Sequence, residues 1–217
     1  MPTPGFAPGT LDEDGTPVWI TDLSPEDPNH TVHVVRGLSP TEALMALGAK
    51  PGLIVPCELP AERPDEWTSL ARAATGAHDS GAVLLAGRIG EWTFVHDDSG
   101  LTCYDEDGEP PAAVLSAAGG TAASSTFTVN ADTSLAYAVD GELRFFVTEE
   151  LDPVQDTESI PAGLRAAVEA AGVFEEDGLD EGEPDGGINL RVLCALAGLD
   201  RTLEDLRRIP LWAAPLG

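Results

Sequence analysis

Residues 134–147 read Ser-Leu-Ala-Tyr-Ala-Val-Asp-Gly-Glu-Leu-Arg-Phe-Phe-Val, and this stretch decides the fold class. The central Asp140-Gly141 pair favours a two-residue hairpin turn, because both residues tolerate positive φ angles. On each side the larger apolar residues recur at every second position, which places them on one face of a strand. The pattern predicts two antiparallel strands, over residues 135–139 and 142–147.

Further strands are predicted on the N-terminal side of this hairpin. Residues 82–89 are mostly apolar, and Gly90 separates them from the alternating segment 91–96, which indicates a second hairpin. Residues 30–36 and 124–129 have the composition of strands. The sequence therefore predicts an α+β protein with a central antiparallel sheet of about five or six strands and helices packed on it.

The clearest helix signal is Ser39-Pro40-Thr41-Glu42. The Ser39 hydroxyl can cap the helix, Pro40 suits the first helical position, and Glu42 can accept a hydrogen bond from the Ser39 amide. This pattern is typical of a capping box and predicts a helix that ends near Gly48. We expect further helices at residues 65–74, 111–118, 161–171, 188–197 and 202–208.

Composition along the chain suggests its boundaries. Residues 1–17 are rich in Pro, Gly and Asp and are expected to form a flexible arm. Residues 18–210 are expected to form a single α+β domain, interrupted by an acidic loop at residues 174–187. Residues 211–217 follow Pro210 and are assigned to a C-terminal tail.

The charge balance is the strongest indication of a partner. The chain of 217 residues holds 11 Lys and Arg against 38 Asp and Glu, a formal net charge of −27. Such a chain repels phosphates, so direct nucleic-acid binding is disfavoured and a protein with a basic surface is the expected partner. Alternatively, the acidity only keeps the chain soluble. The predicted acidic interaction surface comprises Glu175, Glu176, Asp177, Asp180, Glu181, Glu183 and Asp185.

Cysteine usage and the lack of long apolar runs suggest a cytoplasmic protein. The three cysteines, Cys57, Cys103 and Cys194, form no CxxC pair, and their number is odd. Both features favour reduced thiols. The N-terminal residues lack the pattern of a signal peptide, and no apolar run is long enough to span a membrane. The oligomeric state is left open.

Several polar side chains are candidates for binding. Arg36 and Arg88 are scarce cations near strand ends, and Trp92 and His96 follow in the second strand of the 82–96 hairpin. Asn130 and Asp132 lie in a connection between strands, where they can bind a ligand or form an Asx turn. His30 and His33 should point to opposite faces of one strand, so a shared metal is not expected. We predict no catalytic residue, no metal ligand and no cofactor, since no phosphate-binding, nucleophile or metalloprotease motif occurs.

Short segments of the chain resemble a known family. Residues 34–44 (VVRGLSPTEAL), 87–93 (GRIGEWT), 129–132 (VNAD) and 193–199 (LCALAGL) are similar to the DUF6461 family of uncharacterised actinobacterial proteins. The resemblance extends in outline over residues 19–210 and implies the family's domain, but no activity. The acidic stretch after Phe174 departs from the family pattern.

Three functions are compatible with these observations. The first is an acidic protein-interaction module, for example an immunity or inhibitor protein that covers a basic toxin or nuclease. The second is a small-ligand-binding domain that uses Arg36, Arg88, Trp92 or Asn130. The third is an enzyme of unrecognised class, which would need measured turnover that depends on His96 or Asp132.

Overall fold

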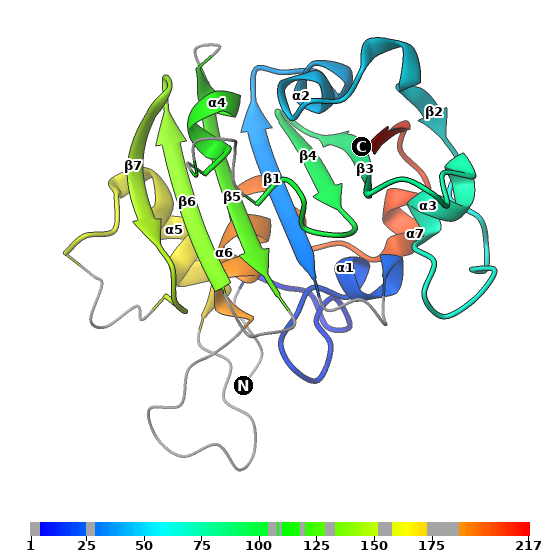
Figure 1. The fold of residues 1–217 in the computed structure, drawn as a ribbon. Helices are drawn as coiled ribbons and strands as arrows, with labels where there is room; N and C mark the ends of the chain where they lie inside the picture. The colour runs from blue at the N-terminus through cyan, green and yellow to red at the C-terminus, as the bar shows by residue number, and fades with distance from the viewer. Residues whose placement is uncertain are drawn as a thin grey trace.

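In the computed structural model, residues 5–24, 29–103, 108, 110–117, 120–128, 133–151, 158–172 and 187–217 are described. Within them, eight strands form one antiparallel sheet in the order β2-β8-β3-β4-β1-β5-β6-β7 (Figure 1). The strands are β1 (His30–Arg36), β2 (Val55–Cys57), β3 (Ala82–Ile89), β4 (Trp92–Asp97), β5 (Thr121–Phe127), β6 (Thr133–Val139), β7 (Glu142–Val147) and β8 (Leu211–Leu216).

Helices flank this sheet on both faces (Figure 1). They are α1 (Val18–Leu23), α2 (Pro40–Ala46), the 3-10 turn η1 (Pro51–Leu53), α3 (Leu70–Thr75), α4 (Ala112–Ser116), α5 (Ala162–Ala171), α6 (Ile188–Ala197) and α7 (Leu203–Leu206). The α+β class is therefore confirmed.

The expected sheet of five or six strands is too small, because β2 and β8 are missing from it. β2 has three residues and includes a proline, so it carries no strand pattern. β8 was assigned to the 211–217 tail, yet it pairs with β3 from Ala82↔Leu216 to Gly87↔Leu211. Two alanines and Pro215 hide this strand in the sequence. Pro215 is tolerated because β2 pairs with β8 only as far as Ala213, so no strand needs its missing N–H.

Local signals predicted the two hairpins and the first capped helix correctly. Asp140 has φ 53° and Gly141 has φ 82°, as the hairpin between β6 and β7 requires. The Ser39 side chain accepts from the Glu42 amide, and the Glu42 carboxylate accepts from the Ser39 amide at 2.8 Å. β1 is not part of a simple meander, since it lies between β4 and β5.

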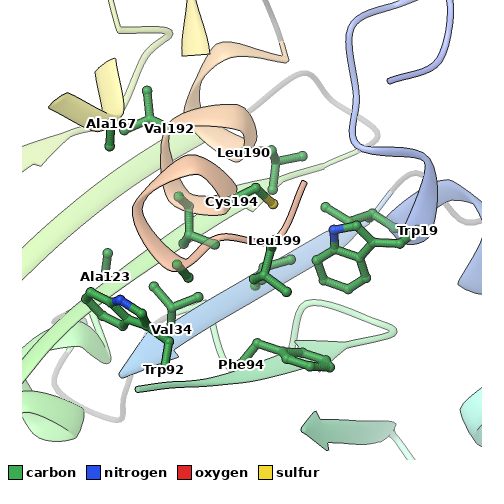
Figure 2. Close-up of a cluster of buried hydrophobic side chains, with 14 of the residues drawn as sticks. Trp19, Val34, Trp92, Phe94, Ala123, Ala167, Leu190, Val192, Cys194 and Leu199 are labelled. Atoms are coloured by element: carbon green, nitrogen blue, oxygen red, sulfur yellow. The ribbon is translucent and has the colours of Figure 1, made fainter. Parts of the chain in front are cut away.

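The alternating residues of each strand supply two cores. Val32 and Val34 of β1 face a large core that includes α1, α5 and α6, whereas Val35 faces a smaller core with α2 and α4. Figure 2 shows the large core, where Leu190 and Cys194 of α6 lie above the sheet and close to Trp19. α6 is buried almost all round, as its sequence predicts.

Residues 5–17 of the expected flexible arm lie against the body of the protein. The Gly5 amide donates to the Ala170 carbonyl at 2.8 Å, and Phe6 is 8% exposed. Leu11 and Pro17 form an antiparallel bridge. Arg191 of α6 is fully buried and donates to the Gly15 carbonyl at 3.1 Å, which holds residues 5–17 against α6.

Candidate functional site

Strand β1 and the β3–β4 hairpin place three of the candidate residues, Arg36, Arg88 and Trp92, near one end of the sheet. Arg36 is paired with Trp92 across β1 and β4, and its guanidinium lies over the indole ring at 4.9 Å. Arg36 also approaches Glu91 at 3.9 Å. Arg88 is paired with Thr93 and so lies on the other face of the sheet, where its Nε donates to the Gly90 carbonyl at 3.2 Å. The two arginines therefore do not converge on one ligand.

His96 lies toward the other end of β4, away from Arg36 and Trp92. It is 1% exposed, so its ring is buried and does not offer a surface to an external ligand. Its ring lies 6.0 Å from the Trp19 ring and 5.8 Å from the His30 ring. Burial lowers the pKa of His96 to about 3, and the neighbouring His30 acts in the same direction. The ring is therefore neutral near pH 7.

His33 lies on the opposite face of β1, as its spacing from His30 predicts. Its Nδ1 is 2.7 Å from Ser124 Oγ and its Nε2 is 2.9 Å from Thr102 Oγ1. The Thr102 hydroxyl donates to Asp97 Oδ2 at 2.7 Å, so it accepts from His33 Nε2 and leaves Nδ1 to accept from Ser124. Burial lowers the pKa of His33 to about 3. This buried chain satisfies every hydrogen-bonding group of the ring and favours a structural role.

The remaining candidates lie outside the described residues. These are Asn130, Asp132 and the acidic surface residues Glu175, Glu176, Asp177, Asp180, Glu181, Glu183 and Asp185.

A polar hollow of about 330 Å³ lies where α3 begins and β4 ends. Sequence reasoning missed it, because its residues come from distant segments. At its base the Asp98 carboxylate forms a bidentate pair with Arg72, through Nε at 3.1 Å and Nη2 at 3.0 Å. Asp98 also accepts from the Ser69 hydroxyl at 2.6 Å and the Val83 amide at 2.7 Å. The hollow is lined by Ser24, Trp67, Thr68, Ser69, Arg72, His78, Asp98 and Ser99.

All five N–H donors of Arg72 have partners within this arrangement. Besides Asp98, they reach the carbonyls of Ala77 and Ser80 and the hydroxyl of Ser99. A guanidinium in this state has no donor left for an anionic ligand. The pair therefore clamps α3 to the adjoining ends of β3 and β4.

The family of unknown function DUF6461 matches residues 17–197. The chain belongs to this family. The match covers β1 through α6 and stops before β8, which completes the sheet of this DUF6461 member beyond the matched range. No curated protein and no solved structure matches the chain.

Two of the three thiols of this DUF6461 member, Cys57 and Cys194, are poorly placed for nucleophilic chemistry. Burial raises the pKa of Cys194 to about 12 and that of Cys57 to about 11. Both therefore stay protonated near pH 7, and a thiol attacks poorly without its charge. Cys194 is fully buried in α6, the packing role that its sequence context predicts.

In the described ranges, no three His, Cys, Asp or Glu side chains are grouped so that they can hold a metal ion. Among the same residues, no helix combines the length and apolar character that a membrane crossing requires.

Proposed function

We propose that this chain is an acidic interaction protein whose partner is a protein with a basic surface. The observation that carries the proposal is the excess of carboxylates. Even if each of the 11 basic residues neutralised one of the 38 acids, a net charge of −27 would remain. This excess cannot be hidden in the core, since an unpaired buried carboxylate is strongly disfavoured.

Nine of the 11 basic residues are already engaged within the molecule. Lys50 and all ten arginines lie in the described part of the chain. Within it, Arg36, Arg72, Arg144, Arg207 and Arg208 form ion pairs with carboxylates. Others donate to main-chain carbonyls, namely Arg63, Arg88, Arg165 and Arg191. An external cationic surface therefore meets carboxylates with little competition from the chain's own cations.

Such a surface accelerates association with a cationic protein and weakens with salt. An immunity or inhibitor protein that covers a basic toxin or nuclease needs such fast association with a cationic surface. We expect the immobilised chain to retain basic proteins at about 50 mM salt and to release them at about 500 mM, because screening shortens the range of the attraction. Retention of neutral or acidic proteins alone, or binding unaffected by salt, would contradict the proposal.

Small-ligand binding is a second candidate, favoured by the hollow beside Trp67. Because Arg72 and Asp98 are saturated by each other and their neighbours, a ligand there would have to use His78, Thr68 and the indole. A metabolite specific to the folded state must raise the melting temperature. A thermal-shift screen in which no compound stabilises the wild-type chain would therefore remove this candidate.

A further inference from the structure

Trp67 is an unusual surface residue. Its side chain is 72% exposed, the highest value among the large apolar residues of the described chain. Of the other three tryptophans, Trp19 is fully buried, Trp92 is 7% exposed and Trp212 is half-buried. An indole that stays in water contributes little to the stability of the fold, whereas tryptophan is one of the side chains that contribute most to the binding energy of protein interfaces.

The backbone that carries Trp67 is fixed in place. Asp65 Oδ1 accepts from the Trp67 amide at 2.9 Å and from the Thr68 amide at 2.8 Å. Asp65 Oδ2 accepts from the Thr68 hydroxyl at 3.0 Å, and Ser69 caps α3 immediately afterwards. The indole is thus presented by a pre-organised turn, so less ordering is needed when a partner binds.

A second hollow, of about 580 Å³, adjoins the same segment. Asp65 and Glu66 line it, whereas Trp67, the next residue, lines the first hollow. Leu70 and Leu203 close its floor but are only 2% and 9% exposed. Four carboxylates line it against two arginines. Arg63 donates to the Glu66 carbonyl at 3.2 Å and Arg207 to the Pro60 carbonyl at 2.7 Å, and both also attract the Asp22 carboxylate. The lining therefore keeps an excess of two negative charges, four carboxylates against two guanidiniums. The carboxylates belong to Asp22, Glu62, Asp65 and Glu66.

We propose that Trp67 and this second hollow form the docking site for an arginine- or lysine-bearing segment of the basic partner. This inference rests on the proposed function and names where the partner is held. The indole face attracts a cation. The aliphatic stem of a cationic side chain can lie on the exposed indole, while its charge meets the carboxylates of the hollow. Complementary charge thus selects a basic protein segment over a second copy of this acidic chain.

The test uses fluorescein-labelled octa-arginine and fluorescence anisotropy with the full-length chain. We expect Trp67→Ala, and separately the double substitution Glu62→Gln with Glu66→Gln, to weaken binding about tenfold at low salt. The matched controls are Phe146→Ala, which removes another exposed aromatic ring at 38% exposure, and Glu149→Gln with Glu150→Gln, which removes two carboxylates elsewhere. Both controls should bind within about twofold of the wild type.

The outcomes separate the two proposals. If the wild type binds the peptide with salt sensitivity but both test variants match their controls, the docking site is wrong and the acidic interaction function survives. If the wild type does not bind the peptide at low salt, both are wrong. Far-ultraviolet circular dichroism of each variant checks that the fold is kept, which the exposure of Trp67 leads us to expect.

Discussion

Acidification should unfold this protein at a higher pH than its surface carboxylates alone would suggest, because two buried histidines take up protons when the chain unfolds. Burial lowers the pKa of His33 and of His96 from 6.5 to about 3. Below pH 6.5 the unfolded chain binds protons at both rings and the folded chain does not. The free energy of unfolding therefore falls as the pH falls from about 6.5 toward 3.

The magnitude follows from proton linkage. Each ring contributes about 1.4 kcal/mol per pH unit within that window, so the two together remove about 4 kcal/mol by pH 5. That is a large part of the 5–15 kcal/mol, roughly, that stabilises a typical domain. Burial raises the pKa of Asp97, which acts in the opposite direction as its folded form takes up a proton. This opposing effect operates between 3.8, the ordinary pKa of an aspartate, and the raised pKa of Asp97 in the folded chain.

The assay is urea denaturation at pH values of about 7, 6 and 5. His96→Phe keeps an aromatic ring beside Trp19 and His30 but removes one titrating group, so the loss of stability per pH unit should fall by about half. His78→Asn is the matched control, because it removes an exposed histidine. An identical pH dependence in the wild type and in His96→Phe would refute the reasoning.

Three further changes should destabilise the fold, as measured by chemical denaturation. Arg72→Met should lower the free energy of unfolding by about 3–5 kcal/mol, because it leaves the Asp98 carboxylate buried without its guanidinium partner. A smaller loss of stability than in the surface variant Arg208→Met would contradict the role of this ion pair. Gly87→Ala should lower the free energy of unfolding by about 1–3 kcal/mol, since the new Cβ would lie 2.7 Å from both Leu211 Cδ2 and Phe94 Cε1. Unchanged stability would contradict this, because it would mean that the two side chains move aside without loss. Deleting residues 211–217 should abolish cooperative unfolding, because β8 lies between β2 and β3 in the sheet. A truncated chain that still unfolds cooperatively would show that these residues are the dispensable tail that the sequence suggests.

The parts predicted from sequence are those with short-range causes. The limits of β1, β3, β7 and α6 match their expected ranges, and the Ser39 capping box forms as its pattern predicts. Periodicity, turn residues and caps act over a few positions, so they can be read from a single sequence.

Trp67 shows where periodicity misleads. The pattern over residues 65–74 predicts a helix with Trp67 and Leu70 on its apolar stripe. Instead Asp65 captures the Trp67 and Thr68 amides in a turn, and α3 begins only at Leu70. The competing hydrogen bonds of an aspartate side chain outweigh the helical pattern here, and they leave the indole in solvent.

The sequence by itself determined the fold class, the hairpins, the family membership and the excess of 27 negative charges. Only the tertiary structure decided that β8 joins the sheet, that Arg72 and Asp98 clamp α3, and that Trp67 stands beside an acidic hollow. The physical reason is separation along the chain. Arg72 and Asp98 are 26 residues apart, and β8 meets β3 across more than half the chain, so no local pattern records either contact.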